Sequence, residues 1–471
     1  MKMQQLSAQD AQFLYIETGN NLTHVMGVNI YDPTTAPGGK VRFKDIIEHV
    51  ESRLECSPVF KRRLMRLPYD FDHPYWVEDE YFDVEHHMFH GRLPEPGDWR
   101  QFCIHLARHF SRPMDMNRPL WDMYVIEGLD RISGIPAGSY AIATRVHHSA
   151  IDGASAMHFF SALSDIDAKG TPAIKLEPTG EQPGTMPSTV SVLNRALASN
   201  VQSPVKMAST LLRFSPAIFD TIIKSLGSEG GKSKKVPLTR FNQPVSPHKM
   251  FDASIIQLAD LRLIKDSVEG CTINDVVLAI CAGALRSYLK HHDELPEDPL
   301  VAIAPVNARR SNRDAEAPGN NISAMSVSLP TNLADPLDRL QTIRDTTKQT
   351  KAAKSGISAR LMTDLTKHVP AATMAGVARL VTSGRFTSKL CNVFISNVPG
   401  PQVPLYMNGA KLLHNFGLAP LADGMGLFIA TPSYNGEMAF CIISSREIMP
   451  DIEFFKDCLG ASFEELFELS T

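Results

Sequence analysis

The amino-acid sequence predicts an α/β protein with two sandwich domains. The chain has 471 residues, which is long for a single hydrophobic core and fits two domains of ordinary size. Both halves contain stretches in which apolar residues alternate, as in strands, and stretches in which they recur at helical spacing. With 43% hydrophobic and 21% charged residues, the chain can fill two cores and is not expected to be disordered as a whole.

The N-terminal domain is expected to span residues 1–185. Residues 24–32 (HVMGVNIYD) and 139–146 (SYAIATRV) alternate as strands do. Residues 41–54 (VRFKDIIEHVESRL) and 98–115 (DWRQFCIHLARHFSRPMD) place apolar side chains on one face of a helix. Strands and helices therefore mix in this half, as they do in an α/β sandwich.

A linker is expected over residues 186–241. It overlaps a stretch rich in proline, glycine and threonine at residues 168–190, a composition typical of chain between domains. Within the linker we predict a helical stretch at residues 190–226 and a mobile loop at residues 227–235 (GSEGGKSKK).

The C-terminal domain is expected to span residues 242–471. Thr272 and Asp275 form a capping pattern at the start of one helix, and residues 452–469 predict another at the end of the chain. Residues 426–445 form two apolar runs around an Asn-Gly pair, a strong signal for a hairpin. This half therefore also predicts an α/β sandwich.

Composition and charge argue against several classes of function. A net charge of −4 gives no support to a nucleic-acid partner, which favours a basic surface. The seven cysteines are scattered and form no Cys-x-x-Cys motif, so we expect no disulfide framework and no bound metal. The start of the chain lacks the apolar core of a signal peptide, and no apolar run reaches the roughly 20 residues that span a bilayer. We therefore expect a cytoplasmic protein whose contact with a membrane would be peripheral.

The stretch RVHHSAIDGAS at residues 145–155 sets two histidines four residues ahead of an Asp-Gly pair. Other His-His pairs occur at residues 86–87 and 291–292, so a pair alone is uninformative. Only His147 and His148 lie where a predicted strand ends and a helix begins. Such a junction lies at the rim of a sheet, where a side chain can meet a substrate.

Three kinds of role fit these residues: metal binding, proton transfer, or ordinary packing and capping. A metal site needs at least three ligands, and the sequence contains no HExxH motif that would indicate a zinc site. It also contains no GxSxG elbow that would indicate a serine hydrolase. A histidine with a pKa near about 6.5 can take a proton from a hydroxyl, which would make His148 a general base. Asp152 can cap the following helix or pair with an arginine, and Gly153 lets the backbone approach a ligand closely. Spacing alone leaves the general-base and packing interpretations open.

Five blocks of the sequence, in order, carry a resemblance to a known family. HHSAIDG matches the HHxxxDG motif of the CoA-dependent acyltransferase superfamily. The other four blocks are LSAQDAQFLYIETGNNLTHV (6–25), RPLWDMYVIEGL (118–129), INDVVLA (273–279) and SNVPGP (396–401). Together they resemble the bacterial wax ester synthase/acyl-CoA:diacylglycerol acyltransferases over nearly the whole chain. The opening departs slightly from the family, which usually has Pro-Leu-Ser and Pro-Met-His-Val at these places.

The resemblance implies an enzyme that moves a fatty acyl group from acyl-CoA, as substrate, to a long-chain alcohol or to diacylglycerol. It implies no cofactor, and two chloramphenicol-acetyltransferase-like sandwiches with an active-site tunnel at their interface. His148 would be the general base, with His147 supporting it and Asp152 holding the loop as a structural residue. Asn274 would stabilise the oxyanion, and its alternative role is that of an N-cap residue.

Other interpretations stay open at this point. A member of the same superfamily could instead use a carrier-protein thioester or a polyketide acceptor, or could bind lipid without catalysis. Residues 201–226 and 355–381 carry apolar helical stripes with scattered lysine and arginine. Either segment could pack on its own domain or lie on the inner membrane or on the surface of lipid inclusions.

Overall fold

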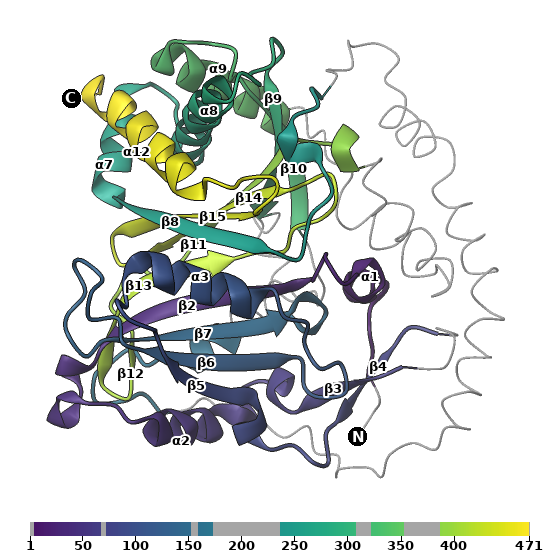
Figure 1. Cartoon of the computed structure of the whole chain (residues 1–471), viewed down its shortest axis with the longest axis vertical. Helices are drawn as coiled ribbons and strands as arrows, with labels where there is room; N and C mark the ends of the chain where they lie inside the picture. The colour runs from purple at the N-terminus through teal and green to yellow at the C-terminus, as the bar shows by residue number, and fades with distance from the viewer. Residues whose placement is uncertain are drawn as a thin grey trace.

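The computed structural model describes residues 4–66, 72–151, 159–172, 236–307, 322–352 and 387–470. Two six-stranded sheets dominate it, with helices packed between and around them (Figure 1). A small three-stranded sheet of β1 (Gln4–Gln5), β4 (Tyr75–Glu78) and β3 (Arg62–Met65) lies near the N-terminus. The predicted class, two mixed α/β units, is confirmed.

The first six-stranded sheet is built mainly from the N-terminal part of the chain. Its strands in order are β12 (Tyr406–Met407), β13 (Ala410–Leu418), β2 (His24–Asp32), β7 (Tyr140–His147), β6 (Trp121–Glu127) and β5 (Met88–Arg92). Only β5 and β6 run parallel, and the other neighbours are antiparallel. Because β7 lies between β2 and β6, its backbone is hydrogen-bonded on both sides and its end is held rigidly.

The second six-stranded sheet belongs to the C-terminal part. Its strands in order are β10 (Ile322–Leu329), β9 (Leu300–Asn307), β11 (Val393–Pro399), β14 (Leu427–Tyr434), β15 (Glu437–Ser445) and β8 (Lys249–Gln257). Here β11 runs parallel to both of its neighbours.

The helices cover these sheets in layers. They are α1 (Ala8–Ile16), α2 (Phe43–Arg53), α3 (Trp99–Phe110), α7 (Leu258–Ser267), α8 (Ile273–His291), α9 (Pro336–Ala352) and α12 (Ile452–Glu468). The 3-10 turns are η1 (Pro33–Thr35), η2 (Pro37–Gly39), η3 (Leu54–Cys56), η4 (Pro58–Phe60), η6 (Val84–His87), η7 (His148–Ala150), η8 (Arg240–Asn242) and η9 (Thr387–Lys389). Figure 1 shows α2 on the outer side of the first sheet, α3 between the two sheets, and α7, α8, α9 and α12 gathered on the outer side of the second.

One hydrophobic core runs from the first sheet through α3 to the second sheet. It includes Val28 of β2, Phe102 and Leu106 of α3, and Phe251 of β8, all buried. Side chains on the opposite face of the first sheet pack with α2 in a second core. Burying apolar surface stabilises a folded protein by about 25 cal/mol per Å². The shared core therefore stabilises the packing of the two sheets against each other.

The chain crosses from the second sheet to the first and back. After β11 ends at Pro399, the chain supplies β12 and β13 to the first sheet and then returns to β14. Gly400 lies at this crossing, where a Cβ atom would stand 2.2 Å from the carbonyl oxygen of Ser433. A glycine is therefore required at this position of the SNVPGP block. The domain boundaries at residues 185 and 242 stay predictions.

Several local elements predicted from sequence periodicity are confirmed. Residues 24–32 and 139–146 form β2 and β7, while the helices expected within 41–54 and 98–115 are α2 and α3. These segments have a period that matches their structure, so local patterning was enough to identify them.

The signals at turns and helix ends are confirmed as well. Asn435 and Gly436 join β14 to β15 with φ angles of 45° and 89°, the left-handed values that a tight hairpin turn needs. Thr272 caps α8, because its Oγ1 accepts a hydrogen bond from Asp275 N at 3.3 Å, while Asp275 Oδ2 accepts one from Thr272 N at 2.9 Å.

The predicted segments 190–226, 227–235 and 355–381 lie outside the described residues. Among the residues that are described, no helix is both long and apolar enough to cross a bilayer.

Candidate active site

His147 and His148 lie where strand β7 ends and turn η7 begins, as predicted. His147 is the last residue of the strand, and its N–H donates to the carbonyl of Leu120 at 3.0 Å. His148 N–H donates to the carbonyl of Thr23 at 3.1 Å. Backbone bonds on both sides therefore fix the position from which each imidazole leaves the chain.

The His147 imidazole is fully buried and bonded at both nitrogens. Its Nδ1 accepts the backbone N–H of Ser149 at 3.1 Å and lies 2.6 Å from Ser149 Oγ. Since Nδ1 is an acceptor, Nε2 carries the proton and points at Glu17 Oε2, 2.8 Å away, and at Thr23 Oγ1, 2.9 Å away. These bonds fix the tautomer and the orientation of the ring.

Glu17 was missed by the sequence analysis, although it lies in one of the quoted blocks. Burial raises the pKa of this carboxyl, but hydrogen bonds from His147 and Thr23 outweigh it and hold the pKa below its usual value. Glu17 is therefore ionised at neutral pH. One signal could have found it: a carboxylate at the C-terminal end of helix α1 opposes the helix dipole and so calls for another partner.

His148 is bonded quite differently from its neighbour. Its ring stacks on Phe13, with centroids 3.9 Å apart and planes inclined by 16°. Its Nδ1 atom is buried, and no partner for it exists among the described residues. Burial lowers the pKa of His148 to about 4. The ring is thus neutral at physiological pH and has a nitrogen that the described protein groups do not occupy.

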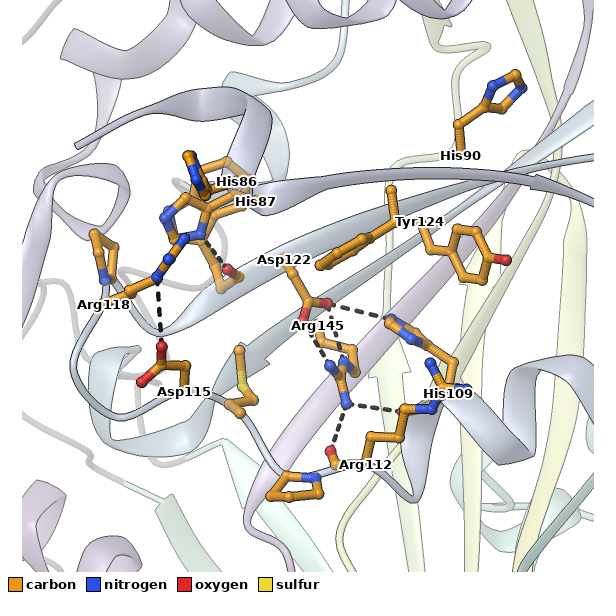
Figure 2. A pocket seen from close by; sticks show the side chains of 15 residues that line it. His86, His87, His90, His109, Arg112, Asp115, Arg118, Asp122, Tyr124 and Arg145 are labelled. Carbon is orange, nitrogen blue, oxygen red and sulfur yellow. Dashed lines mark hydrogen bonds and ion pairs between the residues drawn. The ribbon is translucent and has the colours of Figure 1, made fainter. Parts of the chain in front are cut away.

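A second polar network lies two residues upstream on the same strand (Figure 2). Arg145 donates from Nε to Asp122 Oδ1 at 3.0 Å and from Nη2 to Asp122 Oδ2 at 2.5 Å. Its Nη1 donates to the carbonyls of His109 and Arg112 at 2.8 and 2.6 Å. Burial raises the pKa of Asp122, but the bonds from His109 and Arg145 outweigh this and hold it well below its usual range.

This network forms the wall of a cleft of about 420 Å³ beside β5 and β6. Figure 2 shows Arg112, Arg118 and several histidines around the opening. His148 is not among the residues that line it, so the cleft is separate from the histidine pair. A passage that reaches His148 stays a prediction.

The remaining predicted residues are placed only in part. Asp152 and Gly153 lie outside the described residues. Asn274 is half-buried in the first turn of α8, and the N-cap is Thr272, so the alternative role of Asn274 as N-cap is wrong. Its role at an oxyanion stays a prediction. In the described ranges, no group of three or more His, Cys, Asp or Glu side chains could hold a metal ion.

Comparison with known proteins decides the family. Residues 6–277 match the model of the wax ester synthase/diacylglycerol acyltransferase catalytic domain, and residues 318–467 match the model of the C-terminal domain of the same family. The chain belongs to the wax ester synthase/diacylglycerol acyltransferase family. The resemblance inferred from the five sequence blocks is therefore confirmed.

Individual relatives of this family match over almost the full length. A Mycobacterium tuberculosis protein named as a diacylglycerol O-acyltransferase is 31% identical, over 99% of this chain and 91% of its own. The O-acyltransferase WSD of Acinetobacter baylyi is 30% identical over 96% and 94%. The solved wax ester synthase/diacylglycerol acyltransferase from Marinobacter aquaeolei VT8 is 29% identical, covers 99% of this chain and 100% of its own, and superposes with a TM-score of 0.71.

More distant structures share the fold alone. The trichothecene 15-O-acetyltransferase of Fusarium sporotrichioides superposes with a TM-score of 0.61 at 12% identity, over 98% of this chain and 94% of its own. The two-sandwich architecture therefore also occurs in proteins outside this family.

Proposed function

We propose that this protein is an O-acyltransferase that moves a fatty acyl group from acyl-CoA to a long-chain alcohol or to diacylglycerol. Membership of the family supports the reaction class, and relatives of both names, wax ester synthase and diacylglycerol acyltransferase, support the two acceptors. The observation that carries the proposal is the contrast at the end of β7. His147 is bonded at both nitrogens, whereas His148 is neutral and keeps one nitrogen without a described partner.

In the proposed mechanism, His148 acts as the general base. As the alcohol oxygen attacks the thioester carbonyl carbon, the neutral imidazole takes the hydroxyl proton. The tetrahedral intermediate then collapses, the C–S bond breaks, and the imidazolium returns the proton to the leaving CoA thiolate. The products are an ester and free CoA, and the histidine ends as it began, with no acyl-enzyme.

The other residues support this step. His147, fixed by Glu17 and by the turn at Ser149, holds the backbone that presents His148. Asn274 is our candidate for stabilising the oxyanion, Asp152 for holding the loop, and Gly153 for close approach of the backbone to substrate. A tunnel between the two sheets would exclude water from the thioester, which could otherwise hydrolyse.

We also propose that the lipid substrates reach the site from a membrane or inclusion surface on the cytoplasmic side. Both acceptors partition into lipid, so an enzyme at that surface meets them at high local concentration. Flotation of the purified chain with vesicles that contain diacylglycerol tests this. Protein that stays at the bottom of the gradient would contradict it.

The function is tested by mixing the purified chain with palmitoyl-CoA and hexadecanol and following free thiol. We expect CoA release that depends on hexadecanol or on diacylglycerol, with the matching ester as product. The His148→Ala variant should lose about a thousandfold of this rate while staying folded, because general-base catalysis contributes about 10²–10⁴. As a matched control, His86→Ala removes an exposed histidine of another His-His pair and should leave the rate unchanged.

The outcomes separate the alternatives. Release of CoA without any acceptor would indicate hydrolysis, and activity only with a carrier-protein thioester would indicate the other branch of the superfamily. No turnover with any thioester would indicate the remaining alternative, a protein that binds lipid without catalysis. A folded His148→Ala variant that keeps most of the rate would refute the general-base assignment.

A further inference from the structure

Lys249, the first residue of β8 in the second sheet, is a buried lysine. Its ammonium group hydrogen-bonds to the loop that leads into β2 of the first sheet. Its side chain is only 7% exposed, and its Nζ donates to the carbonyl oxygens of Asn20 at 2.7 Å and Ser246 at 2.9 Å. Burial lowers its pKa to about 8, although Asp423 and Glu447 favour the charged form.

The acceptor Asn20 belongs to the loop of residues 17–23 that connects α1 to β2. This loop begins at Glu17 and ends at Thr23, whose side chains both contact His147 Nε2. Thr23 Oγ1 and Glu17 Oε2 lie 2.8 Å apart, and the Thr23 carbonyl accepts the His148 N–H. Among the described residues, Glu17 and Thr23 of this loop therefore supply the side-chain contacts at His147 Nε2 and the carbonyl that accepts the His148 N–H.

The middle of the loop has little packing to hold it. Residues 18–20 are exposed, and their internal bonds are a short turn in which Thr18 N donates to the Asn21 carbonyl at 3.1 Å and Asn21 N to Thr18 Oγ1 at 3.2 Å. The ammonium of Lys249 is a charged donor, and charged donors form hydrogen bonds about twice as strong as neutral ones. It attaches the exposed part of the loop to the second sheet.

We propose that Lys249 is a positioning residue for acyl transfer, which holds loop 17–23 from the second sheet so that Glu17 and Thr23 keep the histidine pair in place. The proposal rests on the proposed role of His148. It makes the geometry of a base on the first sheet depend on how the second sheet is docked. The two sheets must therefore be correctly docked for the imidazole of His148 to be held in its working position.

A second polar contact from the same strand supplies a matched control. Trp99 of α3 donates from Nε1 to Asp252 of β8 at 2.7 Å, and Lys456 also pairs with Asp252 at 3.3 Å. This contact joins the same parts of the molecule but does not touch loop 17–23. Trp99→Phe removes one interdomain hydrogen bond without disturbing the loop.

The test compares Lys249→Met, Glu17→Gln and their double variant in the full-length chain. Lys249→Met should lower kcat about tenfold with KM for palmitoyl-CoA changed less than about twofold, since only the presentation of the base is disturbed. In the Glu17→Gln background the same substitution should lower kcat less than about twofold, because both act through one loop. Trp99→Phe should leave kcat near that of the unchanged chain in either background.

Hydrogen exchange gives a readout that does not require activity. In Lys249→Met, peptides that cover residues 17–23 and 146–150 should exchange faster, whereas in Trp99→Phe they should not. If Lys249→Met fails to fold, Lys249→Gln keeps an N–H donor and should show a smaller change in the same direction.

Three results would overturn the proposal: an unchanged kcat in Lys249→Met, full additivity with Glu17→Gln, or unchanged exchange at residues 146–150. A chain that transfers no acyl group would refute the proposed function instead, and the exchange measurement would still test the role of Lys249.

Discussion

The network around Arg145 and the histidine pair lie next to one another on β7, yet they differ in how completely their polar atoms are bonded. Arg145 makes two bonds to Asp122 and two to backbone carbonyls. His148 has a buried nitrogen with no partner among the described residues. Burying an unpaired polar atom costs about 1–3 kcal/mol, so a fold retains one chiefly where it has a use.

This difference indicates separate duties along one strand. The saturated network leaves no buried charge unpaired, so removing any one of its charged groups is expected to be costly. Both ring nitrogens of His147 are hydrogen-bonded as well, so this residue fixes the backbone from which the His148 side chain extends. His148 is the group that is held in place and left available, which is what a base needs.

The largest expected effect is on stability, at the saturated network. Asp122→Ala would leave the Arg145 guanidinium buried without its carboxylate, and breaking such a pair typically costs about 3–5 kcal/mol. Chemical denaturation should show this loss. Asp115→Ala removes the carboxylate of an exposed pair with Arg118, and should cost less than about 1 kcal/mol. Equal losses in the two variants would show that the buried and the exposed ion pair contribute alike to stability.

The next effect concerns pH and His148. Its pKa is lowered to about 4, so the imidazole stays neutral and competent as pH falls from 7 to 5. The acid limb of kcat/KM should therefore lie near pH 4. A histidine with the ordinary pKa of about 6.5 would lose roughly 30-fold by pH 5, or about 2 kcal/mol. A limb at pH 6.5 would show that His148 is not buried in this way, or is not the base.

Stability must be followed over the same range as a control. The pKa of His148 in the folded chain lies below its value in the unfolded chain, so the unfolded chain takes up the proton first as pH falls. Stability contributed by the neutral ring is present above about pH 6.5 and is lost between there and about pH 4. His24, whose pKa burial lowers to about 3, acts in the same direction. Circular dichroism at each pH separates unfolding from loss of the base.

The smallest expected effect is at Glu17. Glu17→Gln keeps an acceptor for His147 Nε2–H but removes the negative charge, and hydrogen bonds to charged groups are about twice as strong. We expect kcat to fall about tenfold, or about 1.4 kcal/mol, with the melting temperature nearly unchanged. Steady-state kinetics at saturating palmitoyl-CoA measure this. A variant that loses as much as His148→Ala would instead place Glu17 in the proton transfer itself.

At this site, the histidine pair could be predicted from the sequence, whereas its bonding partners could not. The histidine pair could be identified because the strand period of residues 139–146 ends directly before it. Glu17 could not be paired with His147 in this way, since the two are 130 residues apart and meet only because β2 and β7 are neighbours in register. The partner of Arg145 likewise depends on the register of β6 against β7.

The sequence by itself determined the class of fold, the local elements and the family. Periodicity, caps and turn residues act over a few neighbours, and the hairpin at Asn435 and the cap at Thr272 illustrate how strongly they specify structure. Only the tertiary structure decided that β12 and β13 complete the first sheet and that Lys249 reaches Asn20. Those contacts join segments hundreds of residues apart, and their geometry follows from how two sheets pack around α3, which no local pattern encodes.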